Sequence, residues 1–305
     1  MRRSIHFELS FVLGCFLIFG AAACCAGQTG TDSGTSQPQA VPAATFSDFQ
    51  CTGFIADTPE PGAIRLYNGA DNDLFEELHT FTPGDLVYLR SSGGQTFRAG
   101  EAFSLIRPDK APHLSYKWLP SAIENQVQPF APNYKHQTRS IKDLGFPYDN
   151  TGLVRVVRTT PEGAIAQVEF ACTAINAQDI AIPYVPEAIP EYAPNQTFDP
   201  YAPPDGKLQG TIVGANAAAT FLARGSIAFL NIGQNEGVRP GQRYRIYVIF
   251  RHNVMMGLEN HKQALDTPRE TVGELVILHV QGKASEGIVI DSRREISVGD
   301  GVELE

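Results

Sequence analysis

Two cysteines carry the side chains best suited to chemistry. Cys51 and Cys172 are the cysteines beyond the first 26 residues, and a thiolate becomes a nucleophile when a histidine accepts its proton. The histidines in the same half of the chain are His79, His113 and His136. A structural use competes with catalysis, either as a disulfide in an oxidising compartment or as two unpaired buried thiols. We favour the structural use, because Cys172 aligns with Ser292 at the end of a repeated strand.

Motifs for other chemistries are weak. The sequence contains no G-x-S-x-G elbow for serine hydrolysis. Beyond the leader no two histidines are three or four residues apart, and no C-x-x-C pair occurs, so structural zinc is not indicated. The acidic stretch 71–77 lacks the spacing of a calcium loop and favours a solvated face or a helix start. The glycines in 91–95 favour a hairpin loop over a phosphate cradle. We therefore predict a non-enzymatic protein with no cofactor or metal.

Aromatic residues in a long insertion, 109–150, are the best candidates for ligand contact. Tyr116, Trp118 and Tyr134 stand there among prolines and charges, and loops on a rigid scaffold often carry recognition. Such rings can stack on sugars. The alternative, which we favour, is that they pin the loop to its own domain or pack the two domains together.

The first 26 residues have the layout of a secretory signal. Two arginines precede an apolar run over 9–20, and small residues follow it. The run is too short to span a bilayer comfortably. We expect cleavage after Ala23 or Ala26, with lipid attachment at Cys24 as the less favoured alternative. The protein is then expected in the periplasm or at the outer envelope, and it touches a membrane only if Cys24 is lipidated.

Composition indicates two domains. A chain of 305 residues can bury two cores, and a formal net charge of −9 offers no basic field for nucleic acid. Residues 27–45 contain few large apolar groups and predict a disordered tether. The proline-rich segment 185–207 predicts an extended, semi-rigid linker. We place the first domain at 46–184, with the insertion 109–150 inside it, and the second at 208–305.

The two domains repeat one pattern. Residues 84–106 align with 225–247 without a gap. In the turn "RPGQ" the proline presets φ and the glycine after it permits the positive φ of a type II turn. The residues assigned to structural turns are Gly100, Pro240, Gly241, Asp179 and Asp300. The shared residues therefore encode the bends of a fold.

Apolar and polar residues alternate within each copy, as in strands with one buried face. In the second domain we expect strands at 211–215, 226–232, 242–251, 273–281, 283–291 and 301–304. A short helix is expected only at 71–78. Six short strands suit a small closed or partly closed barrel, because closure removes exposed edges. The predicted fold class is all-β, with two small barrel-like domains.

The second domain resembles a known family through its segments "GVRPGQ", "VGELVILHV", "IVIDS" and "ISVGDGVEL". They are similar to the C-terminal domain of the bacterial flagellar assembly protein T, and related modules accompany peptidoglycan-binding LysM repeats in secreted bacterial proteins. The resemblance extends, more weakly, over 51–184. It implies small barrel-like modules of envelope assemblies, with no catalytic residues. This chain departs from the family by its two modules and its insertion, and it lacks the family's other domains.

These observations lead to two functional hypotheses. The first is an exported, non-enzymatic envelope protein with a scaffolding or protein-interaction role. The second is a protein that binds peptidoglycan or another carbohydrate through the aromatic insertion.

Overall fold

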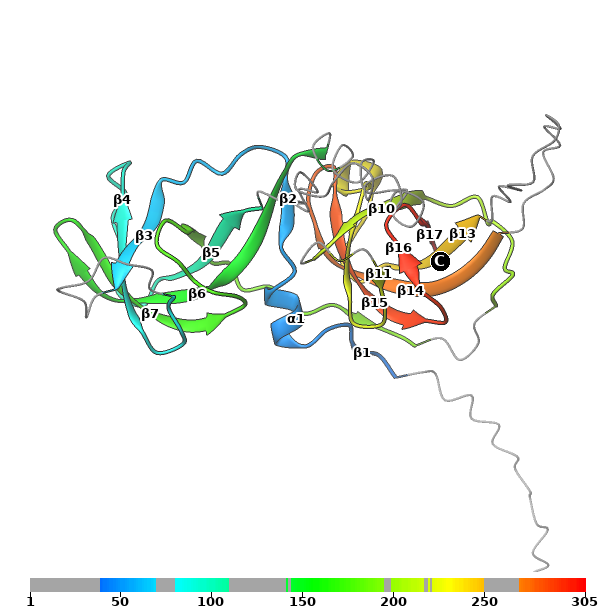
Figure 1. Cartoon of the computed structure of the whole chain (residues 1–305), viewed down its shortest axis with the longest axis horizontal. Coiled ribbons are helices and arrows are strands. Elements are labelled where there is room, and N and C mark those ends of the chain that lie inside the picture. The colour runs from blue at the N-terminus through cyan, green and yellow to red at the C-terminus, as the bar shows by residue number, and fades with distance from the viewer. Residues whose placement is uncertain are drawn as a thin grey trace, which may run out of the picture. The chain divides into compact units, whose positions relative to one another are not determined.

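Two closed six-stranded β-barrels make up the protein in this computed structural model (Figure 1). The structure describes residues 39–69, 80–109, 141, 144–194, 199–216, 219, 221–249 and 269–305. The expected signal sequence, most of the expected tether, the helix expected at 71–78 and the aromatic residues Tyr116, Trp118 and Tyr134 lie outside the described residues. The prediction of an all-β fold with two small barrels is confirmed.

The first barrel closes in the strand order β3-β4-β7-β6-β5-β8, and every pairing is antiparallel. Its strands are β3 (Ile64–Gly69), β4 (Leu86–Ser91), β5 (Ala102–Pro108), β6 (Phe146–Thr160), β7 (Gly163–Ala171) and β8 (Ile180–Pro183). An additional strand, β2 (Phe54–Ala56), pairs with the start of β6 outside the ring. Because β6 begins at Phe146, the last residues of the predicted insertion 109–150 are strand.

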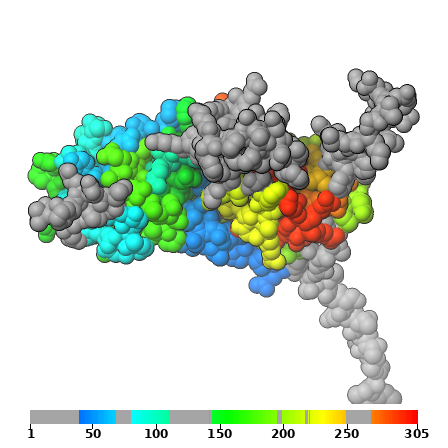
Figure 2. All heavy atoms as spheres, viewed as in Figure 1, coloured from blue at the N-terminus to red at the C-terminus, as the bar shows by residue number. Residues whose placement is uncertain are grey.

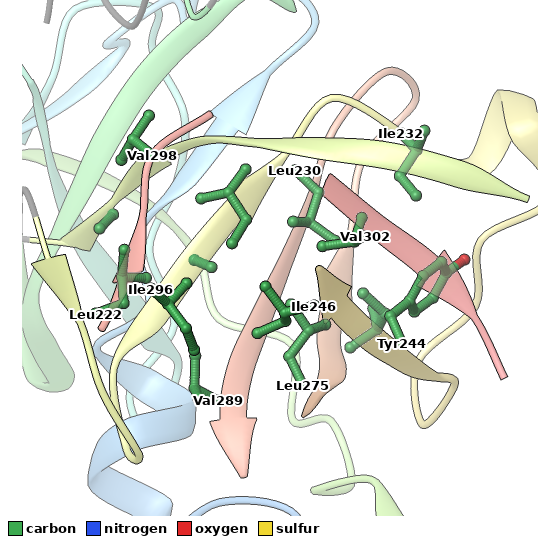
Figure 3. Close-up of a cluster of buried hydrophobic side chains, with 14 of the residues drawn as sticks. Leu222, Leu230, Ile232, Tyr244, Ile246, Leu275, Val289, Ile296, Val298 and Val302 are labelled. Atoms are coloured by element: carbon green, nitrogen blue, oxygen red, sulfur yellow. The ribbon is translucent and has the colours of Figure 1, made fainter. Parts of the chain in front are cut away.

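The second barrel closes in the order β10-β12-β15-β14-β13-β17. Its strands are β10 (Gln209–Ala215), β12 (Ile227–Leu230), β13 (Arg243–Ile249), β14 (Arg269–Val280), β15 (Ser285–Ser292) and β17 (Gly301–Leu304). Inward side chains from these strands, among them Leu230, Ile246 and Leu275, point toward one another and fill the interior (Figure 3). A short pair, β11 (Phe221–Leu222) with β16 (Ile296–Ser297), adds Leu222 and Ile296 to this core.

The barrels are copies of one unit in strand order and in register. The pair Leu86 and Gln167 between β4 and β7 corresponds to the pair Ile227 and Ile288 between β12 and β15. Bulges also interrupt the β5–β6 and β6–β7 ladders at the positions where they interrupt β13–β14 and β14–β15. A bulge displaces every later side chain along its strand, so matching bulges require the two copies to share their backbone course.

The repeated "PG" turn has the predicted conformation. Gln242 donates its backbone N–H to the carbonyl of Arg239 at 3.2 Å. Gly241 has φ +83° and its counterpart Gly100 has φ +85°. Pro240 occupies the position at which type II turns favour proline. The turn then delivers the chain into β13, and the equivalent turn delivers it into β5.

The two predicted aspartate turns also match. The Asp179 carboxylate accepts the backbone N–H of Asn176 at 3.1 Å, and the Asp300 carboxylate accepts that of Ser297 at 2.8 Å. Asp179 has a second role, because Arg107 donates to both of its oxygens at 2.7 and 2.8 Å. Burial raises the pKa of Asp300 to about 6. The two aspartates therefore close the same kind of turn, one in each barrel, but differ in electrostatic surroundings.

A short helix that the sequence analysis missed precedes the first barrel. Helix α1 (Phe46–Gln50) begins after Thr45, whose hydroxyl accepts the N–H of Asp48 while the Asp48 carboxylate accepts the N–H of Thr45. This capping box is readable in the sequence, but a helix of one turn and a half is too short to show an apolar period. Upstream, β1 (Val41–Pro42) pairs with β9 (Glu191–Tyr192). The end of the expected tether is therefore held in place.

The described residues of the proline-rich segment 185–207 contain no helix, as its composition predicts, and they run along the second barrel. Arg243 donates to the carbonyl of Ala193 at 2.7 Å, and the backbone N–H of Thr271 donates to the carbonyl of Pro200 at 2.7 Å. Asp205 lies 3.2 Å from Arg245. The segment is therefore docked by main-chain and ionic contacts in addition to joining the two barrels.

Residues of the first barrel's N-terminal segment pack against the second barrel. Ile55 of β2 shares a buried apolar cluster with Val213 of β10 and Ala284, and Phe229 packs against that cluster. Phe49 of α1 joins a second cluster with β12, β14 and β15. In Figure 2 the blue atoms of this segment adjoin the yellow atoms of the second barrel. The described part of the chain from Pro38 onward forms one compact unit.

Candidate functional site

The two cysteines named in the sequence analysis form a disulfide. Cys51 and Cys172 are bonded, with their Cα atoms 5.4 Å apart. The bond ties the end of α1 to the end of β7, so neither sulfur supplies a thiolate. The alignment of Cys172 with Ser292 is wrong by one residue. Cys172 donates its backbone N–H to the carbonyl of Thr151, and Arg293 donates its own to the carbonyl of Val272. Arg293 is therefore the counterpart of Cys172.

A polar depression of about 290 Å³ lies beside the disulfide. Its lining includes Ser47 and Asp48 of α1 and Asn216 and Ser226 of the second barrel. Asn216 donates its side-chain amide to the carbonyl of Cys51 at 2.6 Å. The depression therefore marks the place where the helix and the second barrel meet.

A charged network on the second barrel gathers two guanidinium groups around one carboxylate. Arg245 of β13 and Arg269 of β14 both donate to the same oxygen of Glu303 in β17. The other oxygen accepts from the side chain of Gln209 at 2.9 Å and from the N–H of Asp205 at 3.3 Å. Glu303 is fully buried. The network connects β10, β13, β14 and β17 to the end of the linker.

Electrostatics in this network favour the charged state of its carboxylate. Although burial raises the pKa of Glu303, hydrogen bonds from Arg269 and Gln209 outweigh it and hold that pKa below its usual value. Register places Ser104, Tyr148 and Ile182 of the first barrel at the positions of Arg245, Arg269 and Glu303. A barrel of this kind therefore closes without the charges, and in the second barrel Arg245 and Glu303 of the network also contact Asp205 at the end of the linker.

A second buried carboxyl lies where β2 meets the second barrel. Glu286 of β15 has no exposed surface. One oxygen accepts the backbone N–H of Ile55 at 3.3 Å, and the other has no hydrogen-bond partner among the described residues. Burial raises the pKa of Glu286 to about 8. The carboxyl is therefore protonated at neutral pH and contributes a neutral polar contact.

A groove lies on the outside of the first barrel, and we call it the tyrosine groove. It has a volume of about 420 Å³, and Tyr67 of β3, Tyr88 and Arg90 of β4 and Glu162 of the β6–β7 turn line it. Tyr67 is 51% exposed and Tyr88 is 37% exposed. Large exposed aromatic rings on a rigid surface are frequent anchors of binding sites.

Local strand geometry aims these side chains outward. Tyr88 and Arg90 alternate along β4 with Val87 and Leu89, which are buried in the barrel. Tyr67 is the extra residue of a bulge in the β3–β4 ladder, so its ring is displaced from the regular row. The groove is thus built on strands and one tight turn.

The charged groups of the groove contact one another and one of the rings. The guanidinium of Arg90 lies over the ring of Tyr67, 4.4 Å from its centroid. It also pairs with the Glu162 carboxylate at 3.2 Å. Both partners of that ion pair are well exposed, so solvent screens the pair and a bound group can replace either contact. The site offers two aromatic faces, a cation and a carboxylate.

Sequence reasoning missed this groove. The gap-free alignment of 84–106 with 225–247 places Tyr88 opposite Phe229, but the sequence analysis proposed no binding surface at either residue. A signal was present, because Tyr88 and Arg90 fall on the polar row of an alternating strand. A large tyrosine on that row, Tyr88, indicates an aromatic outer face.

The described residues hold neither a cluster of histidine, cysteine and carboxylate groups able to bind a metal nor a helix long and apolar enough to cross a membrane. No protein-family model matches the chain, and no curated protein matches its sequence.

Proposed function

We propose that this chain is an exported, non-enzymatic protein of the cell envelope that acts in scaffolding or protein interaction. The observation that carries the proposal is the tyrosine groove, an aromatic surface displayed on rigid strands. Two structural features, the disulfide and the packing of α1, support a binding role for the connected pair of barrels. The disulfide fixes α1 to the first barrel, and α1 packs on the second. The leader-like residues 1–26 support export, after which the envelope is the compartment in which such a bond persists.

The flagellar-protein resemblance enters here as part of the proposal. Two barrel modules with the same strand order suit an assembly protein, because a repeated module presents related surfaces in fixed positions. Recognition then rests on the outer faces of the strands, where Arg155 and Gln167 of the first copy stand at the positions of Val276 and Ile288.

A second candidate function is binding of peptidoglycan or another carbohydrate. Tyr67 and Tyr88 offer ring faces for sugars, while Arg90 and Glu162 offer hydrogen bonds to hydroxyl groups. The aromatic insertion with Trp118 supplies a further candidate surface.

Site-specific photo-crosslinking in the native envelope tests the first function. A photoreactive phenylalanine analogue at position 88 should yield a discrete protein adduct, whereas the same analogue at position 167, on a polar part of the first barrel, should not. Smears of equal intensity at both positions would count against a specific interaction.

Co-sedimentation with purified sacculi tests the second function. Binding that is lost in a Tyr67→Ala, Tyr88→Ala variant would favour the groove as a sugar site. Binding that is lost only in a Trp118→Ala, Tyr134→Ala variant would favour the insertion. If the parent protein stays in the supernatant, the carbohydrate function is excluded for peptidoglycan.

A further inference from the structure

We propose that the tyrosine groove is a socket for an extended protein segment of defined chemistry, an apolar residue followed two positions later by an acidic residue. The inference rests on the proposed interaction role and names its surface and ligand. The reason is internal to the molecule. The same surface on the second barrel already holds such a segment, Ile55–Asp57.

The occupied socket lies on the outside of the second barrel. Ile55 enters an apolar cluster with Val213 and Ala284, against which Phe229 packs. Two residues later, the Asp57 carboxylate accepts the backbone N–H of Gly282 in the β14–β15 turn at 3.0 Å. An extended strand thus inserts one apolar side chain and places one carboxylate on a turn.

Register identifies the tyrosine groove as the equivalent surface of the first barrel. Tyr88 pairs with Ile165 as Phe229 pairs with Glu286. The matching bulges of β3 and β10 place Tyr67 where the second barrel has Val213. The β6–β7 turn that closes the groove corresponds to the β14–β15 turn that receives Asp57. The residues around the occupied socket and around the groove therefore have the same backbone positions.

A second outer surface of the same barrels serves as an internal control. On the second barrel Val276 and Ile288 are buried under α1. Their counterparts by register are Arg155 and Gln167, which are exposed. No described segment covers this surface on the first barrel, and these two positions are polar there, whereas Val157, the counterpart of Leu278, stays apolar and is 49% exposed. The tyrosine groove keeps large aromatic side chains instead, which is the composition of a surface that becomes covered.

The differences between the two sockets define the ligand. Pro161 replaces Gly282 in the turn and has no N–H to offer a carboxylate. Arg90 stands in the position of Asn231 and supplies a cation at the same rim. Ile165 replaces Glu286 as the cross-strand partner of Tyr88, so the surface beside the groove is more apolar. The groove therefore suits an apolar side chain against Tyr67 and Tyr88, with a carboxylate that takes the place of Glu162 on Arg90.

A peptide taken from the chain itself is the probe. A synthetic peptide of residues 52–59, TGFIADTP, is titrated into the full-length oxidised protein and followed by NMR of labelled tyrosine rings. We expect saturable binding that shifts the resonances of Tyr67 and Tyr88. Affinity should fall at least about tenfold in Tyr67→Ala and in Tyr88→Ala, as for anchor residues of an interface. Gln167→Ala, on the polar control surface, should bind like the parent.

A charge reversal tests the acidic position. The Arg90→Glu variant should bind the peptide more weakly than the parent does. A peptide with Asp57→Lys should bind the Arg90→Glu variant better than it binds the parent. The three substituted side chains, Tyr67, Tyr88 and Arg90, are on the surface. The melting temperature of each variant should therefore stay near that of the parent, which excludes unfolding as the cause.

Several outcomes would overturn the inference. These are absence of binding, binding that is indifferent to the groove variants, or binding of a chitin or glycan oligomer at the groove in place of the peptide. Self-association of the parent that the Tyr88→Ala variant abolishes would also overturn it, in favour of a second copy as occupant. Each of these leaves the photo-crosslinking result at position 88 unchanged as a separate measure of the proposed interaction role.

Discussion

At the scale of single residues, buried polar groups and glycines with positive φ carry the clearest energetic consequences. Glu286 is a fully buried carboxyl that bonds the backbone of Ile55 through one oxygen only. Its cost depends on pH, because the ionised form is the one that burial penalises. Gly241 is held at φ +83° by the turn into β13, a region in which β-branched side chains clash with their own backbone.

Glu286 should make the protein less stable as pH rises. Its folded-state pKa of about 8 lies above the unfolded value of 4.5, so its stabilising effect is present below pH 4.5 and is lost as pH rises toward 8. Glu286→Gln removes this dependence. At pH 9 the variant should be more stable than the parent by on the order of 3 kcal/mol, and near pH 4 the difference should shrink. Urea unfolding at both values measures it, and a pH-independent difference would contradict the assignment.

Gly241→Val should be among the most damaging turn substitutions. An added Cβ would find ordinary space at this position, so the loss arises from backbone strain, at about 1 to 3 kcal/mol. Gly241→Asn is the matched control, since asparagine tolerates the left-handed region and should cost less. Thermal melts of the two variants give the comparison. Equal melting temperatures for valine and asparagine would remove the conformational explanation.

At the scale of elements, the linker and α1 are held by specific contacts that the barrels do not need for closure. The charged network of Arg245, Arg269 and Glu303 binds the linker end through Asp205. The first barrel closes with uncharged residues at the three network positions. The comparison of the two barrels therefore indicates that the network serves to dock the linker and can be replaced without loss of barrel closure.

Glu303→Ala should destabilise the second barrel strongly, by about 3 to 5 kcal/mol, because it leaves two largely buried guanidiniums, with side chains 15% and 11% exposed, without their shared carboxylate. A triple variant carrying the first barrel's residues, Arg245→Ser, Arg269→Tyr and Glu303→Ile, should recover most of the loss. Urea midpoints of both proteins measure this. If the triple variant is no more stable than Glu303→Ala, the charges have a role in closure that the comparison of barrels does not explain.

At the scale of the whole molecule, α1 is the element that both barrels share. The disulfide bonds its end to β7 of the first barrel, and Phe49 packs against His279 of the second, with ring centroids 4.1 Å apart. The His279 ring also lies 3.0 Å from the carbonyl of Phe49. Helix α1 is therefore bonded covalently to the first barrel and packed against the second.

Reduction of the disulfide should lower the stability of the molecule. The bond closes a loop with a sequence separation of 121 residues, for which loop entropy predicts roughly 4 to 5 kcal/mol at most. The melting temperature of the parent should therefore fall in dithiothreitol. A Cys51→Ser, Cys172→Ser variant is the control, and it should melt at the lower temperature with or without reductant. Insensitivity of the parent would mean that the folded contacts alone hold α1.

Much of the fold was predictable from the sequence because its determinants are local. Alternation along strands, the proline-glycine turns around Gly100 and Gly241, and the two aspartate turns act within a few residues, so they can be recognised without a structure. The gap-free alignment of the two copies was sufficient to predict matching barrels. A disulfide between Cys51 and Cys172 was one of two structural alternatives that the sequence left open, and the structure shows the disulfide. Helix α1 was not predicted, because five residues are too few to show the periodic spacing of apolar residues that marks a helix.

The outer faces were decided only by tertiary structure. Tyr88 and Phe229 occupy the same position of the same strand, and nothing near either residue in the sequence states that Phe229 packs beside Ile55 while Tyr88 is open to solvent. That difference depends on contacts between residues more than a hundred positions apart. A strand pattern specifies which side chains leave the barrel, and only the folded chain specifies what meets them there.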